Sequence, residues 1–293
     1  MGRAIVRHVL AGDIAAALRG GEKVFYYGGP GIRYLRAAER FVFGDTNLGY
    51  LSLVLLLPIA VFALYRRFMS NRWALALGVI FVAVPVGMMF GTSFFQYARW
   101  AARGFADPAA CIFAICATLY LVGRKAEGPG PGFRAAFASA LLFALAVFVR
   151  PNITPFCGIM LAGAGLAALH QREWRRIAGL WLGFAPVLLV ALHNWYFGNA
   201  LVLFSANATH PLVFVTPPSV YGDALIDLLR LDFASDALAR LATQIVGWLQ
   251  GPSELALLAP LHIVGIVITV RVLSERLFDP WLRLIAAAAL AQH

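Results

Sequence analysis

The chain has 293 residues, of which 61% are hydrophobic and 13% are charged, and its formal net charge is +10. A soluble domain carries about 25% charged residues, so this composition excludes an ordinary soluble domain and favours a protein with several membrane-spanning helices. In such a protein, excess Arg sets topology and contacts anionic lipid, so the positive charge does not predict nucleic-acid binding.

Residues 1–47 are predicted to form a surface segment that contains two amphipathic helices. Apolar residues recur at helical spacing over residues 5–18, and the pair Gly20-Gly21 ends that pattern. We expect one helix over this stretch, with Asp13 inside it. The second helix is predicted to follow the turn "YYGGPG" and to lie, like the first, in the membrane interface.

The turn "YYGGPG" leads directly into a basic helix, and we expect Tyr27, Pro30 and Gly31 to set its geometry. Pro is favoured in the first turn of a helix, where free amide groups attract anions. Arg33 and Arg36 follow at once and suit bidentate phosphate binding. Two interpretations stay open, namely a binding site for a lipid-linked phosphate and interfacial anchoring by Tyr and Arg.

Apolar runs of membrane-spanning length, for which about 20 residues are needed, follow one another along the rest of the chain. They cover residues 48–65, 73–94, 107–123, 133–149, 153–169, 177–196 and 255–270, and another begins near Trp281. We therefore predict an all-α, polytopic transmembrane bundle with interfacial helices in its outer loops. Residues 48–197 form six transmembrane helices, residues 198–253 an outer loop with one surface helix, and residues 254–293 the C-terminal transmembrane helices.

Basic residues concentrate in alternate loops, which sets the orientation of the bundle. The richer set holds Arg66, Arg67, Arg72, Arg124, Lys125, Arg134, Arg172, Arg175, Arg176, Arg271, Arg276 and Arg283. The poorer set holds Arg99, Arg103, Arg150, Arg230 and Arg240. We predict a multi-pass protein of a bacterial inner membrane, with the richer set in the cytoplasm. The basic character of residues 1–47, on the outer side, opposes this orientation.

Asp107 is the main candidate for chemistry, because it lies where an outer loop becomes a helix in "ARGFADPAACIF". Helix capping explains an acid before Pro, and a functional site explains an acid near Arg99 and Arg103. Arg150 ends the fourth span on the same side, where snorkelling is the alternative to a functional role. A positive patch on the outer surface runs against the inside-positive trend and predicts an anionic ligand. The three cysteines lie in apolar runs without metal-ligand spacing, so we predict no metal and no cofactor.

Several stretches resemble the GT-C membrane glycosyltransferases, the relatives of protein mannosyltransferases and of aminoarabinose transferases that act on lipid A. The segment "YYGGPGIRYLRAAERFVFGDTNLGYLSLVLLLPIAVFALYRRF" resembles the family's passage from the first outer loop to the next helix. "ARGFADPAACIFAICATLYL" resembles the second outer loop, and "FVRPN" is similar to bacterial members. The likeness covers residues 20–196.

This resemblance implies transfer of a sugar from a polyprenyl-phosphate donor, with inversion, to a lipid, glycan or protein acceptor at the outer face. Pro30 and Gly31 correspond to the family's turn, and Asp107 corresponds to its second-loop acid. The first-loop acid, which acts as general base in the family, has no counterpart, since Asp13 is expected inside a helix. We therefore expect an N-terminally truncated chain that could be inactive by itself.

Two other functions fit the composition. A transporter or flippase for an anionic lipid-linked substrate needs polar groups at mid-membrane depth, and the predicted spans hold almost none. A non-catalytic membrane subunit would use the outer arginines only as anchors.

Overall fold

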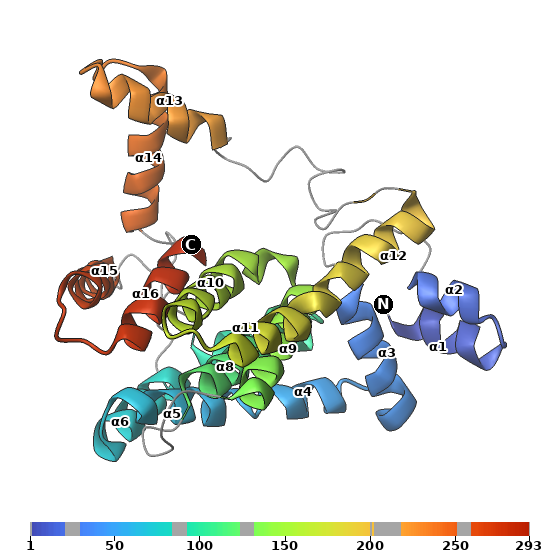
Figure 1. Cartoon of the computed structure of the whole chain (residues 1–293). Helices are drawn as coiled ribbons and strands as arrows, with labels where there is room; N and C mark the ends of the chain where they lie inside the picture. Colours follow the sequence, from blue (N-terminus) through green and yellow to red (C-terminus); the bar gives the residue numbers. More distant parts are fainter. Residues whose placement is uncertain are drawn as a thin grey trace.

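The computed structural model describes residues 2–20, 30–83, 93–123, 132–199, 201, 218–250 and 259–292. It is 84% helix, and no strand occurs in the described residues, which confirms the all-α prediction. The helices lie side by side in one bundle, with a helical pair standing away from it (Figure 1).

The described residues of the N-terminal segment form three helices rather than the two that we predicted. α1 (Gly2–Leu10) and α2 (Ile14–Arg19) are separated at Gly12, whose φ of 78° lies in the left-handed region that Gly tolerates. Asp13 then caps α2 by accepting a hydrogen bond from the amide of Ala16 at 3.0 Å. The prediction of one helix over residues 5–18, with Asp13 inside it, is therefore wrong.

Three helical stretches among the described residues are long and apolar enough to cross a membrane: Leu48–Phe68, Pro151–His170 and Trp174–Gly198. The first joins α4 (Leu48–Val54) to α5 (Leu57–Phe68), and the second joins η2 (Pro151–Ile153) to α10 (Thr154–His170). The third joins α11 (Trp174–Phe184), η3 (Ala185–Val187) and α12 (Leu188–Gly198). Each coincides with a predicted span.

Shorter apolar helices occupy the other predicted spans: α6 (Asn71–Ala83), α8 (Asp107–Val122), α9 (Phe133–Val149) and part of α15 (Ala259–Ser274). The predicted span over residues 73–94 is only partly described, because α6 ends at Ala83 and residues 84–92 lie outside the described residues. α7 (Phe94–Ala102) then begins separately, so Arg99 lies on a helix and not in the loop where we expected it.

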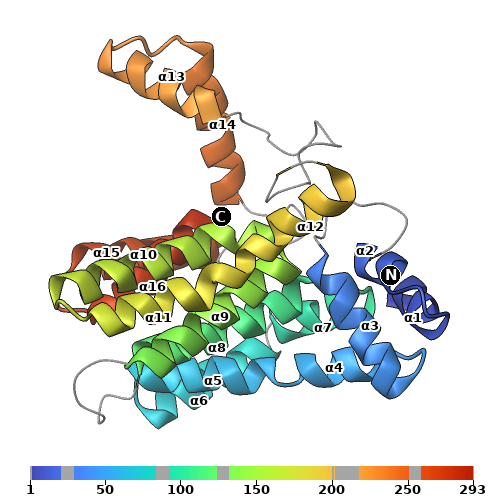
Figure 2. The same cartoon turned by 45° about the vertical axis from the view of Figure 1, so that its right-hand side comes forward.

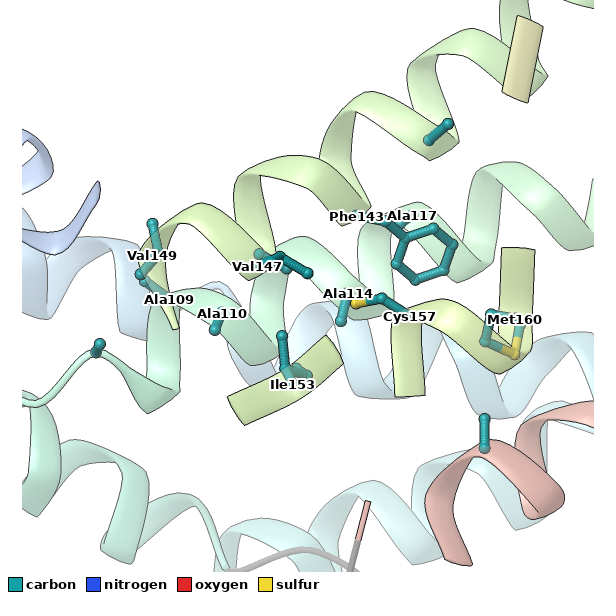
Figure 3. Packing of buried hydrophobic residues seen from close by; sticks show 14 of the residues in the cluster. Ala109, Ala110, Ala114, Ala117, Phe143, Val147, Val149, Ile153, Cys157 and Met160 are labelled. Carbon is teal, nitrogen blue, oxygen red and sulfur yellow. The ribbon is translucent and has the colours of Figure 1, made fainter. Parts of the chain in front are cut away.

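The core lies between α8, α9 and α10, and α8 contributes mostly small side chains to it (Figure 3). α11 packs closely on α9, because glycines on its inner face let the two backbones approach. A Cβ atom placed on Gly179 would lie 2.7 Å from the carbonyl oxygen of Phe133. The outer surface of this long stretch is apolar: Trp181 is 76% exposed. Such a surface suits contact with lipid.

The turns between α5 and α6, between α10 and α11, and between α15 and α16 (Pro280–Gln292) lie at one end of the bundle (Figure 2). These are turns that the sequence places in the cytoplasm. α3 (Gly31–Phe43) and α7 lie toward the other end. The surface helix predicted within residues 198–253 is instead a pair of helices, α13 (Pro218–Leu229) and α14 (Asp236–Gln250).

Candidate functional site

Asp107 and Arg150, two residues that the sequence singles out, form an ion pair. Asp107 is the first residue of α8, and Arg150 follows the last residue of α9. Since the two helices pack antiparallel, these ends meet, and Oδ1 of Asp107 lies 3.2 Å from Nε of Arg150. The Asp107 side chain is 28% exposed and the Arg150 side chain 15%, so the pair lies at the edge of the protein and can be reached from outside.

The capping interpretation of Asp107 does not hold in this structure. The residue at the N-cap position of α8 is Ala106, and it makes no side-chain capping bond. Pro108 occupies the second position of the helix, as is typical of a first turn. The Asp107 carboxylate is therefore directed to a cation rather than to the amides of its own helix.

Tyr50 of α4 links the basic helix α3 to the loop just before α8. The Tyr50 side chain is buried, and its hydroxyl donates a 2.5 Å hydrogen bond to the carbonyl oxygen of Phe105, two residues before Asp107. The guanidinium carbon of Arg36 lies 5.1 Å from the centre of the Tyr50 ring, a cation–π distance. The amide of Tyr50 donates to Oε1 of Glu39 at 2.8 Å. A continuous polar network therefore runs from α3 to the start of α8.

The arginines of α3 face the protein. Nη1 of Arg36 lies 2.5 Å from Oε2 of Glu39, and Nη2 donates to the side chain of Asn47. Nη1 of Arg33 donates to the carbonyl oxygen of Gly20 at 2.9 Å. The contacts of Arg33 and Arg36 thus show how they hold α3 and its neighbours together, and their lipid-phosphate role stays a prediction.

Pro30 and Gly31 form the N-terminal end of α3, as the sequence predicts. Pro30 is the N-cap residue and Gly31 is the first helical residue. A Cβ atom on Gly31 would overlap the carbonyl group of Phe148 in α9, so Gly allows this close approach. The first turn of α3 is buried, which leaves it less open to an anion than we expected. Tyr27 lies outside the described residues.

Arg99 and Arg103 are exposed, unlike the arginines of α3. Arg99 lies on α7 and Arg103 is its C-cap residue, directly before the loop that leads to Asp107. Neither forms an ion pair with a carboxylate in the described part of the chain. The structure therefore places two exposed cations on the elements next to Asp107, which packing of α7 on α8 brings together.

The carbonyl oxygen of Leu18 anchors α2 to the bundle. The hydroxyl of Tyr34 donates to it, and Nε2 of His193 lies 3.2 Å from it. The Tyr34 ring stacks on Phe148 with 6.1 Å between ring centres. Burial raises the pKa of the Tyr34 phenol, so its hydroxyl stays protonated and acts as a donor. Nε2 of His193 on α12 therefore has a partner on α2.

Tyr50, Glu39 and Asn47 are the site residues that the sequence analysis missed. The spacing of Arg36 and Glu39, three residues apart on a helix, was the available signal for an ion pair. Tyr50 gave no signal, because a Tyr near the end of a span is common at a membrane interface.

No group of three His, Cys, Asp or Glu residues that could hold a metal ion occurs in the described ranges. No protein family, curated protein or solved structure is detectably similar to the chain. The geometry around Asp107 and Arg150 therefore carries the functional interpretation.

Proposed function

We propose that the chain is a multi-pass protein of the bacterial inner membrane and a glycosyltransferase of the GT-C type. It transfers a sugar from a polyprenyl-phosphate donor to a lipid, glycan or protein hydroxyl at the outer face. The observation that carries this proposal is the ion pair between Asp107 and Arg150, which puts an acid and a cation side by side at a reachable edge.

The acid and the cation have complementary roles in such a transfer. The acceptor oxygen bonds to the anomeric carbon while the bond from that carbon to the phosphate oxygen breaks. We assign to Asp107 the general-base role that the resemblance gives to a first-loop acid: its carboxylate takes the hydroxyl proton, and the polyprenyl phosphate leaves with the bonding electrons. In this step the ion pair opens around the sugar, and Arg150 donates to the departing phosphate oxygen on the face opposite Asp107 and stabilises its charge. Attack from the side opposite the phosphate inverts the anomeric centre.

The neighbouring arginines support a phosphate at this place. Arg99 and Arg103 are exposed on the segment that leads to Asp107, and a second phosphate contact from either adds charge-assisted hydrogen bonds. The buried Tyr50 side chain binds the carbonyl oxygen of Phe105 and so holds the backbone just before Asp107 in place. A rigid base is what transfer chemistry needs, because small displacements of a catalytic group cost rate.

The test is transfer itself. Membranes that contain the full chain are incubated with polyprenyl phosphates carrying labelled sugars, and the product is analysed for label and anomeric configuration. We expect product above the level of membranes that lack the chain, with the inverted anomer. A folded chain that yields no product with any of the donors, or a product of retained configuration, would overturn the proposal.

A non-catalytic membrane subunit is the second candidate, and the internal partners of Arg33 and Arg36 favour it. In that case the pair of Asp107 and Arg150 would brace two helix ends only. Removing either charge would then lower the thermal stability and leave the binding of polyprenyl phosphate unchanged.

A further inference from the structure

Arg176 at the start of α11 is a buried cation with an unused edge. The residue is 4% exposed, and its Nη1 lies 3.1 Å from Oε2 of Glu173. The other two guanidinium nitrogens, Nε and Nη2, are buried and have no hydrogen-bond partner in the described part of the chain. Of the three nitrogens of this group, only one is therefore satisfied.

The two unpartnered nitrogens are neighbours on one edge of the guanidinium plane. Nε and Nη2 project their N–H bonds in parallel, which is the fork that binds two oxygens of a phosphate or carboxylate at once. A buried charged donor without an acceptor is costly, and hydrogen bonds to charged groups are among the strongest in proteins. An external acceptor with two oxygens would satisfy the whole edge.

The N-cap residue of α11 contacts Arg176 and leaves its Nε and Nη2 edge without an acceptor among the described residues. Glu173 is the N-cap residue of α11 but makes no capping bond, because its carboxylate is turned to Arg176. The amides of Trp174 and Arg176 in this first turn donate to the carbonyl oxygens of Arg172 and Glu173, so the guanidinium group and not a set of free helix amides supplies the positive charge here. The start of α16 has the side-chain cap that the start of α11 lacks, since the amide of Trp281 donates to Oδ1 of Asp279 at 2.9 Å.

The position of Arg176 along its helix matches the level at which lipid headgroups lie. Arg176 lies in the first turn of a stretch that is apolar enough to span a membrane, Trp174–Gly198. Trp174 is 65% exposed, and Arg172 and Arg175 are exposed beside it. Exposed Trp and Arg at the end of a span are typical of the interface where phosphates lie, and basic pockets between transmembrane helices bind lipid headgroups.

We propose that Arg176 binds the phosphate group of an anionic phospholipid between the starts of α11 and α16. The centre of the half-buried Trp281 ring lies 5.7 Å from the guanidinium carbon of Arg176, which places the first turn of α16 beside this group. The turns of α10–α11 and α15–α16 lie at the same end of the bundle (Figure 2), opposite α3, so this site is separate from Asp107 and does not depend on the proposed transfer.

Native mass spectrometry of the purified full chain tests this site. With phosphatidylglycerol we expect about one tightly held lipid per chain, and roughly tenfold weaker binding in Arg176→Gln. Arg72→Gln, at an exposed arginine in the first turn of α6 at the same end of the bundle, is the matched control and should bind as the wild type does. Equal binding by Arg176→Gln, or equal binding of phosphatidylcholine, would overturn the proposal. Competition by millimolar inorganic phosphate would assign the site to a free anion and overturn the lipid assignment.

A second measurement covers the case in which Arg176→Gln does not fold. Arg176→Lys keeps the charge and the aliphatic stem but loses the fork, so we expect a folded protein with weaker lipid binding. For the wild type, phosphatidylglycerol should raise the melting temperature more than phosphatidylcholine does. Equal melting temperatures in the two lipids would contradict the site without any variant.

Discussion

The carboxylate of Asp107 lies 3.2 Å from Nε of Arg150, and this contact joins the start of α8 to the end of α9. Asp107 begins α8 and Arg150 directly follows the end of α9, so the contact arises from antiparallel packing and not from sequence proximity. It gathers an acid and a cation at one reachable edge, with Arg99 and Arg103 exposed on the preceding segment. The proposed transfer uses these two groups, Asp107 as the base and Arg150 as the phosphate ligand.

Replacing Arg150 tests the phosphate half of the site. Arg150→Gln removes a charged donor beside Asp107, and we expect roughly tenfold weaker binding of a polyprenyl phosphate without sugar. Equilibrium binding in detergent measures this change. Arg240→Gln, an exposed arginine on α14, is the control and should leave the affinity unchanged. Equal affinities for the wild type and Arg150→Gln would favour a bracing role for the pair.

Replacing Tyr50 tests the contacts that join α3 and α4 to the loop before Asp107. Tyr50→Phe keeps the ring beside Arg36 and removes only the bond to Phe105, so we expect a folded protein that is destabilised by about 1 kcal/mol. That loss corresponds to a fall of about 2 °C in melting temperature for a chain of 293 residues. Hydrogen exchange should also accelerate at the amides just before Asp107. Tyr120→Phe, at a half-exposed position on α8, should change neither quantity.

Two glycines, Gly179 on α11 and Gly165 on α10, allow a matched test of how closely α11 packs on α9. Gly179→Leu forces a side chain against the backbone of Phe133, and we expect a loss of about 1–3 kcal/mol in the free energy of unfolding. Gly165→Leu on α10 adds the same side chain where nothing lies within 4 Å. Thermal unfolding in detergent should therefore separate the two variants. A loss of similar size in both would show that α9 and α11 are not in close contact.

Asp45 forms two ion pairs that add a pH-dependent contribution to the packing of α1 on α3. It pairs with Arg3 of α1 at 2.5 Å and with Arg40 of α3 at 3.2 Å, and the hydrogen bond from Arg3 is the main cause of its lowered pKa. A lowered pKa means that the pairing stabilises the fold above the ordinary Asp pKa near 4 and is lost as the pH falls through the lower folded value.

We therefore expect α1 to detach from α3 only below about pH 4. Spin labels at the exposed residues Leu10 and Val42 measure the separation of the two helices from pH 7 to pH 3. The distance distribution should broaden at the acid end and should be broad at every pH in Asp45→Asn. Identical distributions for the wild type and Asp45→Asn at pH 7 would show that Asp45 does not hold α1.

Hydropathy predicted most of the helices, because a membrane-spanning helix must be apolar over most of its length. The helix at 133–149 has the predicted bounds, and Leu48–Phe68 extends the predicted run by three residues, from Tyr65 to Phe68. The break at Gly12 escaped prediction because the apolar spacing continues across it. A single left-handed glycine and an Asp cap interrupt the helix without altering its amphipathic pattern.

The candidate site was predicted only in part. Asp107 and Arg150 could be found, since charges at the ends of apolar runs are conspicuous and each lies on the same predicted side. The role of Arg36 could not be predicted from the sequence, because its contacts with Glu39 and Tyr50 depend on the packing of α3 against α4. An arginine-rich helix face has the same sequence pattern whether it meets a phosphate or a buried glutamate.

Sugar transfer by Asp107→Asn tests the central claim most directly. The substitution keeps the shape of the side chain and removes its ability to take a proton, so we expect transfer from a polyprenyl-phosphate sugar to fall by about 10²–10⁴-fold, with expression and donor binding retained. Asp223→Asn, at an exposed position on α13, should transfer at the wild-type rate. A folded Asp107→Asn protein that transfers sugar as fast as the wild type would contradict the account.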